Sequence, residues 1–513
     1  MLNAFGREVP DRDHKGNPLI PFMGVHSAQP ELHRYGPPVK CRFRETTKLI
    51  SSLEDAFRTV PVKSGMTLSF HHHFRNGDRV LNLVLAMAAK LGLKNLTIAV
   101  SSIFPIHEPL IDHMRQGTVT GLDTNYMSGP VARAISGGIL QAPVMMRTHG
   151  GRARAIECGD LHIDVAFIAA PAADRYGNIT GIQGQAACGS LGYAMPDAEY
   201  ADHVVAVTDC VLDYPLSPIS ISQTRVDHVV TVDCVGDPSG IVSGTTQMTH
   251  DPVPLKMASD VAAVIQAAGL IKDGFSFQTG AGGASLASAL FVRDIMEKAS
   301  VTGSFILGGI TEHAVDMLNR GIFKKLLDVQ GFDLAAVKSI AVNPHHVEIS
   351  SSVYANPFNS GCAVNQLDCV VLGATEIDQD FNVNVVTGST GVIMGGAGGH
   401  SDAAAGAALT IVVAKLNRQR FPTVVKNVVT VTTPGETIDV LVTEQGIAVN
   451  PARPDILEML KAANLPIKDI IELQRESEAI TGSAGSDQTS GRSVALVEYR
   501  NGTIIDVVRQ VTA

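Results

Sequence analysis

The sequence has no tryptophan, no long apolar run and no excess of positive charge, and each absence excludes a class of protein. The longest nearly apolar stretch, Ala403 to Ala414, is too short to cross a bilayer as a helix. The net charge of -10 repels polyphosphate backbones, so nucleic acid is excluded as a favoured partner. The first 22 residues carry charges and prolines where a signal peptide needs an apolar core. We expect a cytoplasmic protein that binds neither nucleic acid nor a membrane.

Closely spaced cysteines are also lacking. The seven cysteines are scattered singly and form no Cys-x-x-Cys motif, so a structural zinc site has no ligand set. An odd number of isolated cysteines is typical of reduced thiols in a cytosol.

The size and composition of the chain favour a large globular enzyme. At 513 residues the chain exceeds the length at which single hydrophobic cores stop growing, so two domains are expected. Apolar residues make up 45% of the sequence and charged residues 18%, and the 48 glycines indicate many tight loops.

Strand, loop and helix patterns follow one another in both halves of the sequence. They predict strands over residues 65–70, 96–104 and 274–277, and helices over residues 80–91 and 286–299. Parallel β-loop-α units are the economical interpretation, and they give an α/β fold.

The two halves also share residues at a constant offset. The segment Asp164–Asn178 aligns without gaps with Asp368–Asn382, and Glu108 stands opposite Glu312 at the same offset. Two separate segments with one offset predict tandem related domains, divided near His250 to Asp260.

A dense glycine run, "GGAGGHSD", begins at Gly395 and precedes an alanine-rich helix. It is neither a Walker loop nor the dinucleotide fingerprint, so nucleotide phosphate is not its default ligand. A second loop of this kind, "QTGAGGAS", begins at Gln278. Backbone N–H groups at a helix N-terminus and the carboxyl edge of a sheet suit an anion or an oxyanion. A plain tight turn is the alternative interpretation.

Cationic and imidazole side chains gather in two loops of the first half. The stretches "FHHHFRNGD" and "RTHGGRAR" supply His71, His72, His73, Arg75, Arg147, His149, Arg152 and Arg154. Arginine holds carboxylates in a bidentate fork, so a small, multiply charged carboxylate suits these loops. Solvated loop charges are the alternative, and a metal is disfavoured because adjacent histidines on a strand point to opposite faces.

Along nearly its whole length, the chain resembles a known family, the citrate lyase alpha subunits. The resemblance rests on "SFHHHFRNGD", "LHIDVAFIAAPAADRYGNITG", "FSFQTGAGGASLA", "GGAGGHSDAA" and "LVTEQGIAVNPARP". More distantly, "GGAGGHSD" and "VTEQGIA" are similar to pieces of acetate and 4-hydroxybutyrate CoA-transferases. This implies two tandem CoA-transferase-type (NagB/RpiA-like) domains, residues 51–250 and 251–513, each a largely parallel sheet flanked by helices. Residues 1–50 are then a variable N-terminal extension.

The resemblance implies a citrate CoA-transferase activity. An acyl-carrier or CoA thiol passes from an acetyl thioester to citrate and gives citryl thioester and acetate. No permanently bound cofactor and no metal are implied, because acetyl-CoA or the CoA-like group of an acyl carrier protein is a substrate. The implied partners are the beta (lyase) and gamma (acyl carrier) subunits of citrate lyase, and the chain is expected to form a homo-oligomer.

The resemblance also gives the glycine and basic loops roles. Each acyl step passes through an oxyanion, which fixed N–H donors stabilise. The predicted oxyanion donors are Gly396, Gly398 and Gly399. The predicted citrate-binding residues are His72, Arg75, Arg147, His149, Arg152 and His400. The predicted thioester-binding residues are Gln278, Gly280, Gly282, Gly283 and Asn384.

Glu312 is a further catalytic candidate with two interpretations. In the distant CoA-transferases a glutamate in a short Thr-Glu stretch carries a covalent thioester, and Thr311-Glu312 matches that position. The citrate lyase family implies direct transfer instead, which leaves Glu312 as a helix-start carboxylate favoured by the dipole.

Two alternative functions stay open on the sequence alone. One is a CoA-transferase for another acid, citramalate or a monocarboxylate, with a covalent Glu312 intermediate. The other is a non-catalytic ligand-sensing module of the same fold.

Overall fold

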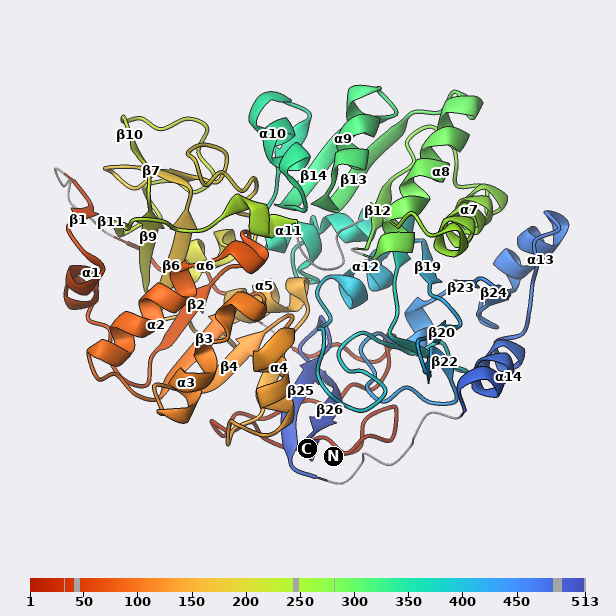
Figure 1. The fold of residues 1–513 in the computed structure, drawn as a ribbon, viewed down its shortest axis with the longest axis horizontal. Coiled ribbons are helices and arrows are strands. Elements are labelled where there is room, and N and C mark those ends of the chain that lie inside the picture. The colour runs from red at the N-terminus through yellow and green to blue at the C-terminus, as the bar shows by residue number, and fades with distance from the viewer. Residues whose placement is uncertain (32, 41–46, 243–248, 281, 483–490, 512–513) are drawn as a thin grey trace.

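Two sheet-and-helix halves lie side by side in the computed structural model, the first orange to yellow and the second green to blue (Figure 1). The described residues are 1–31, 33–40, 47–242, 249–280, 282–482 and 491–511. None of the helices within these ranges combines the length and apolar character needed to span a bilayer.

The first half is built on a ten-stranded sheet of order β1-β11-β9-β6-β2-β3-β4-β5-β25-β26, parallel except for its last pair. Its strands are β1 Leu49–Ile50, β2 Thr67–Phe70, β3 Leu96–Val100, β4 Val119–Thr124, β5 Val144–Met146, β6 Val165–Ala170, β9 His203–Thr208, β11 His228–Thr231, β25 Ser493–Glu498 and β26 Ile504–Arg509. A small sheet beside it comprises β7 Ala172–Asp174, β8 Ile179–Thr180 and β10 Val211–Leu212.

The second half is built on an eight-stranded sheet of order β15-β14-β13-β12-β16-β19-β23-β24. Its strands are β12 Phe277–Thr279, β13 Gly303–Ile310, β14 Phe323–Gly331, β15 His346–Glu348, β16 Cys369–Leu372, β19 Leu409–Val413, β23 Val440–Thr443 and β24 Gly446–Val449. Smaller sheets comprise β17 Glu376–Asp378, β18 Val383–Asn384 and β22 Val424–Val425, and β20 Asn417–Arg418 with β21 Phe421–Pro422.

Helices flank both sheets, and the two predicted helices are confirmed as α2 and α8. The helices of the first half are α1 Leu53–Thr59, α2 Val80–Lys90, α3 Leu110–Arg115, α4 Gly129–Ser136, α5 His149–Glu157 and α6 Met195–Tyr200. Those of the second half are α7 Pro252–Ala267, α8 Gly283–Ala299, α9 Glu312–Asn319, α10 Leu334–Val342, α11 Ser351–Ala355, α12 His400–Gly406, α13 Pro454–Ala462 and α14 Ile470–Thr481.

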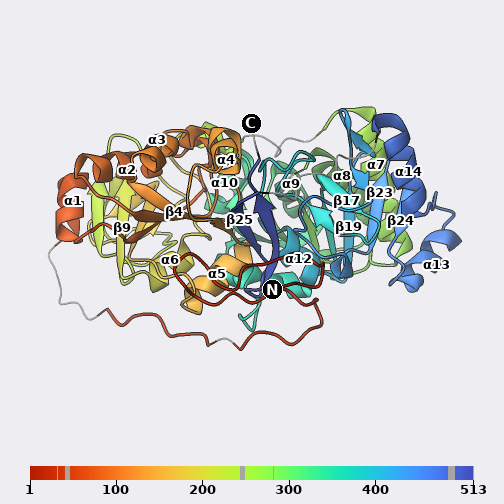
Figure 2. The ribbon, with the colours of Figure 1, turned by 90° about the horizontal axis from the view of Figure 1, so that it is seen from below.

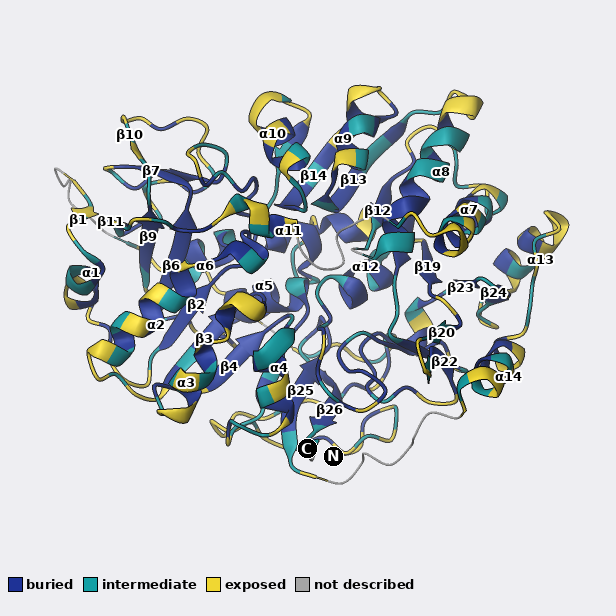
Figure 3. Ribbon diagram, viewed as in Figure 1, coloured by how far each residue is buried: buried dark blue, intermediate teal, exposed yellow. Residues whose placement is uncertain are grey.

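The strands are the most buried part of the molecule, and the outer helices carry exposed faces (Figure 3). Every residue of β6, Val165–Ala170, is buried, and the run contains no polar side chain. Parallel strands covered by helices on both faces read as continuous apolar runs, which is why these segments lack alternation.

The strand order shows the internal repeat. Read from one edge, the first sheet runs β11-β9-β6-β2-β3-β4-β5, and the second runs β23-β19-β16-β12-β13-β14-β15 with its strands in the same succession along the chain. The aligned aspartates also accept equivalent backbone hydrogen bonds. Asp164 accepts the N–H of Thr67 at 2.7 Å, and Asp368 accepts the N–H of Ser276 at 2.8 Å.

A second aligned pair closes equivalent turns. Asp174 accepts hydrogen bonds from the backbone of Tyr176, the backbone and side chain of Asn178, and the backbone of Leu216. Asp378 accepts from the equivalent set, which comprises the backbone of Asp380, the backbone and side chain of Asn382, and the backbone of Val428. The shared residues of the repeat are therefore turn-forming residues.

The predicted division into residues 51–250 and 251–513 differs from the structure at the C-terminus. The hairpin β25–β26 returns to the first sheet, where β25 pairs in parallel with β5 (Figure 1). The pairing satisfies the edge of β5, which would otherwise expose unpaired backbone groups. The C-terminal strands therefore tie the second half of the sequence to the first sheet.

The predicted N-terminal extension lies along the surface and docks on this hairpin (Figure 2). Ile504 donates its N–H to the carbonyl of Ile20 at 2.7 Å, and Asn3 donates its side-chain N–H to Ile505 at 2.6 Å. Phe22 is fully buried and stacks edge-on against Tyr499. The extension is therefore packed against the C-terminal strands.

The glycine run does not follow a regular strand, although a strand is expected before it. In residues 385–399 Ile393 forms an isolated bridge with Thr387, and Gly391 has a positive φ of 76°. The left-handed backbone at Gly391 turns the chain there, so the loop reaches α12 without a strand.

Removing either repeated aspartate will weaken the fold. Asp174→Ala and Asp378→Ala each leave four donors without their carboxylate, which lowers the free energy of unfolding by about 2 to 3 kcal/mol. Urea denaturation followed by circular dichroism measures this. Asp380→Ala, at an exposed neighbour, is the control, and equal losses in all three variants would contradict the turn assignment.

Candidate functional site

The glycine loop, Gly395 to Gly399, lies at the contact between the two halves, and all of its glycines except Gly398 lack room for a side chain. A Cβ atom on Gly396 would lie 2.2 Å from the carbonyl oxygen of Asn125 and 2.6 Å from the Cα of Tyr126. A Cβ atom on Gly399 would lie 2.3 Å from the hydroxyl oxygen of Tyr354. Nonbonded atoms do not come so close, so Gly396 lies directly against the backbone of Asn125 and Tyr126, and Gly399 lies against the side chain of Tyr354.

Two helix N-termini converge on this loop. Helix α12 begins directly after it, and α5 begins at His149, whose N–H donates to the carbonyl of Gly398 at 2.7 Å. Asp402 in the first turn of α12 accepts from the N–H of Gly150 and the hydroxyl of Thr148, each at 2.8 Å. Burial raises the pKa of Asp402 to about 6, and these hydrogen bonds partly offset that effect.

The three predicted oxyanion donors are not equivalent. Gly398 has a left-handed backbone with φ of 51° and donates its N–H to the carbonyl of Asn125 at 3.3 Å. Within the described residues, the N–H groups of Gly396 and Gly399 have no acceptor. Gly396 and Gly399 are therefore better placed than Gly398 to hold a ligand oxygen.

A stack of rings from the first half faces the loop. The ring centroids of His72 and His149 lie 5.5 Å apart, and Tyr193 lies 4.6 Å from the first and 4.4 Å from the second. The His149 ring is near the loop, because its Nε2 would lie 3.5 Å from a Cβ on Gly398. Burial lowers the pKa of His72, and it lowers that of His149 to about 3. Both rings are therefore neutral near pH 7.

Arg75 brings a cation into the same region. Its guanidinium lies 5.0 Å from the ring centre of Phe104 and 5.4 Å from that of Phe332, which belongs to the second half. Burial lowers the pKa of Arg75. Burial is the largest cause of the lowered pKa values of His72 and His149, and the charge of Arg75 lowers both pKa values further. The predicted citrate-binding residues His72, Arg75 and His149 are thus brought together.

Arg147 and Arg152 are also buried, but carboxylates already hold them. Arg147 pairs with Asp123 at 2.8 Å and with Glu498 of the C-terminal hairpin. Arg152 forms a bidentate pair with Asp197, with both contacts at 2.6 Å. Burial opposes ionisation of Asp197, yet Arg152 holds the pKa of that carboxyl well below its usual range. The predicted contact of these arginines with citrate stays a prediction, and the structure shows each of them in an ion pair.

The histidine triplet divides among separate partners, as expected for adjacent residues. His71 Nε2 lies 3.1 Å from Asp197, and His73 Nε2 lies 2.8 Å from the carbonyl of Ala169. Only His72 faces the ring stack, with its Nδ1 held by Ser101 at 2.6 Å. The flanking two histidines are part of the core.

His400 anchors the glycine loop rather than leaving a ring nitrogen for a ligand. Its Nδ1 lies 2.7 Å from the hydroxyl oxygen of Thr433, and its Nε2 lies 2.9 Å from the carbonyl oxygen of Gly373. Burial lowers the pKa of His400 to about 4, so the ring is neutral. Because both ring nitrogens already have partners, the His400 side chain has no free donor for the predicted contact with citrate.

The second glycine loop opens a cavity at the carboxyl edge of the second sheet. Gly280 donates its N–H to the carbonyl of Val371 at 2.7 Å, and Gly282 and Gly283 begin α8. The cavity has a volume of about 320 Å³. Its lining includes Met257, Gly282, Gly283, Ser285, Gly373 and Lys415. Two of the predicted thioester-binding residues therefore line an open space that a ligand can enter.

Asn384 and Glu312 lie apart from this arrangement. The side chain of Asn384 donates to Glu376 at 2.9 Å and accepts the N–H groups of Val386 and Thr387. It therefore shapes a turn, and its predicted contact with the thioester has no free group. Glu312 is the first residue of α9, and its side chain is 67% exposed.

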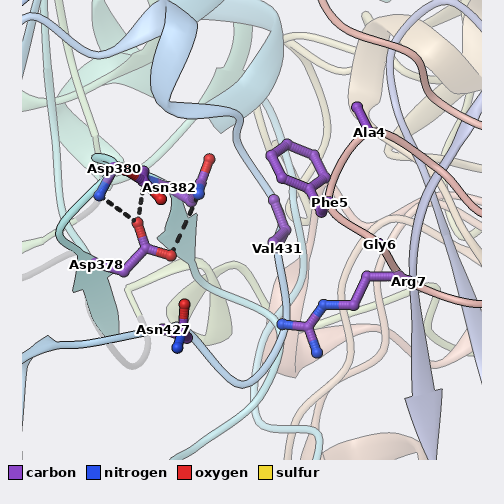
Figure 4. A pocket seen from close by; sticks show the side chains of 9 residues that line it. All are labelled: Ala4, Phe5, Gly6, Arg7, Asp378, Asp380, Asn382, Asn427 and Val431. Atoms are coloured by element: carbon purple, nitrogen blue, oxygen red, sulfur yellow. Dashed lines mark hydrogen bonds between the residues drawn. The ribbon is translucent and has the colours of Figure 1, made fainter.

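A second cavity, of about 490 Å³, lies between the N-terminal extension and the turn of Asp378 (Figure 4). Phe5 and Arg7 line one side, and Asp378, Asp380 and Asn382 line the other. The carboxylate of Asp378 is already used within its turn, as the dashed lines show. This cavity contains none of the predicted site residues.

The family of the chain follows from comparison with known proteins. A family model of the citrate lyase alpha subunit matches residues 46–511. The chain belongs to the citrate lyase alpha-subunit family. The citrate lyase alpha chain of Klebsiella pneumoniae is 47% identical over 495 residues, which is 96% of each chain. The resemblance inferred from the sequence motifs is therefore confirmed.

Solved structures agree with this family and with the predicted fold. A citrate lyase alpha subunit from Streptococcus mutans, in complex with citrate, matches with a TM-score of 0.95 and 47% identity over 100% of both chains. A 4-hydroxybutyrate CoA-transferase from Porphyromonas gingivalis matches with a TM-score of 0.54 and 17% identity, over 83% of this chain and 96% of its own. The second match shows the fold alone, and the predicted CoA-transferase-type fold is confirmed.

Sequence reasoning missed the carboxylates that neutralise the arginines and the tyrosine that contacts Gly399. Asp123, Asp197 and Glu498 lie 24, 45 and 351 residues from their arginine partners. No local spacing signals such pairs, because they form only when distant segments fold together.

Arg152 is predicted to stabilise the first half. Arg152→Ala leaves Asp197 buried without its cation, so it lowers the free energy of unfolding by about 3 to 5 kcal/mol. Arg225→Ala is the matched control, because its pair with Glu199 at 3.0 Å is half-exposed and contributes at most about 1 kcal/mol. Denaturant titration compares the two variants, and a loss at Arg152 no larger than that at Arg225 would contradict the ion-pair assignment.

Proposed function

We propose that this chain is the transferase component of citrate lyase. It exchanges the acetyl group of a thioester for a citryl group and releases acetate. The observation that carries this proposal is membership of the alpha-subunit family over residues 46–511. The citrate in the Streptococcus mutans relative, which matches the whole chain, supports citrate as the acid.

The reaction needs two acyl transfers. A carboxylate oxygen of citrate attacks the acetyl thioester carbonyl, the C–S bond breaks, and a citryl-acetyl anhydride and a thiolate form. The thiolate then attacks the citryl carbonyl, and acetate leaves with the bridging oxygen. Each attack places negative charge on a carbonyl oxygen, and fixed N–H donors stabilise that charge.

The contact between the halves supplies these donors. The N–H groups of Gly396 and Gly399 lie where α5 and α12 begin, so two positive helix ends support the same place. Arg75 and the neutral rings of His72 and His149 come from the first half and face the loop. We assign the citrate carboxylates to this side, because it holds the cation.

We assign the thioester arm to the second half. The lining of the cavity at the start of α8 includes Gly282, Gly283 and Lys415. Gly373, which lines the cavity, holds the ring of His400 at 2.9 Å, and His400 directly follows the glycine loop. The side chain of His400 therefore joins the lining of this cavity, where we place the thioester arm, to the loop that carries the oxyanion donors.

We propose direct transfer without a covalent Glu312 intermediate. The carboxylate of Glu312 is 67% exposed and lies at the positive end of α9, where the dipole favours any acidic side chain. A nucleophile that must exclude water from its thioester is disfavoured in such a position. The non-catalytic sensing alternative is not favoured, because the relatives over the whole chain are enzyme subunits.

The partners and setting extend this proposal. We propose that the chain works with the beta and gamma subunits of citrate lyase, with the acyl carrier or acetyl-CoA as a transient thioester substrate. A homo-oligomer in the cytoplasm, with no permanently bound cofactor, completes the proposal.

The isolated chain will exchange acyl groups without cleaving citrate. Incubation with acetyl-CoA and citrate is expected to give citryl thioester and acetate, measured by mass spectrometry. Oxaloacetate is not expected, because cleavage belongs to the beta subunit. Tricarballylate and citramalate serve as control acids, and turnover of either one faster than citrate, or release of oxaloacetate, would contradict the proposal.

Direct transfer makes Glu312 dispensable. Glu312→Gln keeps the size of the side chain and removes its carboxylate. The exchange rate is therefore expected to stay within a few-fold of that of the parent chain. Removal of a covalent nucleophile would instead lower the rate by about 10⁴-fold or more. Glu297→Gln, at an exposed helix carboxylate, is the control. An adduct at Glu312 trapped by hydroxylamine or borohydride would place the chain among the covalent CoA-transferases.

A further inference from the structure

Tyr354 reaches the glycine loop from the second half, and neither the sequence motifs nor the comparisons give it a role. It lies in the short helix α11, and its side chain is only 2% exposed. Its hydroxyl oxygen would lie 2.3 Å from a Cβ on Gly399, so the oxygen sits directly against that glycine. The phenol oxygen of Tyr354 therefore contacts Gly399, the residue directly before α12.

The hydrogen bonds of this hydroxyl are only half complete. The side-chain N–H of Gln278 donates to the Tyr354 oxygen at 2.9 Å, so the oxygen is the acceptor in that bond. The hydroxyl hydrogen must therefore point elsewhere. Among the described residues, no acceptor takes it. A buried donor without an acceptor is costly, and it needs a reason.

The phenol is protonated near neutral pH. Burial raises the pKa of Tyr354 well above its usual range, and the nearby charge of Asp402 raises it further. The hydroxyl hydrogen is therefore available for a hydrogen bond to a ligand. The hydroxyl oxygen packs against Gly399, whose own N–H has no acceptor among the described residues. Two donors without acceptors therefore lie at the same residue of the loop.

We propose that the hydroxyl of Tyr354 is a further oxyanion donor, which acts with the N–H of Gly399 on the carbonyl oxygen of the reacting acyl group. This rests on the transferase function proposed above. The tyrosine donates a hydrogen bond and transfers no proton, so the bonds made and broken are those of the two acyl transfers.

Gln278 is then the positioning residue for this tyrosine. Its amide nitrogen fixes the phenol oxygen from β12, at the start of the second glycine loop. Among the described residues, its own buried amide oxygen has no hydrogen-bond partner. The loop predicted to bind the thioester and the loop predicted to hold the oxyanion are therefore linked through one hydroxyl.

Tyr354→Phe tests the proposal, because it keeps the ring against Gly399 and removes only the hydroxyl. In acetyl-CoA:citrate exchange by the full chain, kcat is expected to fall by about 10²- to 10³-fold while both KM values stay nearly constant. Gln278→Leu is expected to lower kcat by a smaller factor, because the hydroxyl remains but loses its alignment. Tyr499→Phe is the control, because that hydroxyl is equally buried and has no hydrogen-bond partner among the described residues.

Parental kcat in Tyr354→Phe would overturn the proposal, as would an effect on the KM for citrate alone, which would make the tyrosine a carboxylate ligand. A loss equal to that in Tyr499→Phe would also overturn it, because any buried hydroxyl would then have the same effect. The wild-type chain in the same assay separates these outcomes from a failure of the proposed function. If the wild type exchanges no acyl groups, the transferase assignment itself fails.

Discussion

The close backbone approach of the glycine loop to its neighbours is the constraint on which the rest of this structure depends. Gly396 touches the backbone at Asn125, and Gly399 touches the phenol of Tyr354, with no space for a methyl group at either. The loop can therefore lie between the starts of α5 and α12, with its N–H groups near two positive helix ends. A side chain at Gly396 would push the halves apart, and one at Gly399 would displace Tyr354 from the loop.

Charge is arranged so that this place stays receptive to anions. The first half buries several arginines, but Asp123, Asp197 and Glu498 neutralise Arg147 and Arg152. The imidazoles beside the loop are neutral because burial lowers their pKa values. Positive potential at the loop therefore comes from Arg75 together with helix ends and N–H groups whose positions are fixed by the fold. Fixed dipoles need no rearrangement as charge develops on an acyl oxygen, and this suits acyl transfer better than mobile charges do.

Local patterns predicted the helices α2 and α8, the tandem repeat and the position of both glycine loops, because periodicity and turn residues act over a few positions. The pairing of His72, Arg75 and His149 also follows from loops that share one sheet edge. The sequence could not show that Asp197 holds Arg152, or that β25 joins the first sheet, because these contacts join distant segments. Tyr354 stands in an ordinary polar stretch, and only the fold places its hydroxyl against Gly399.

The central claim is that both substrates meet at the glycine loop between the halves, and a crystal structure with citrate and an unreactive acetyl thioester analogue tests it most directly. The account predicts the acyl oxygen within hydrogen-bond distance of the N–H of Gly399, and citrate on the side of Arg75 and His149. Citrate in the cavity beside Phe5 and Arg7, or a thioester oxygen remote from Gly399, would contradict it.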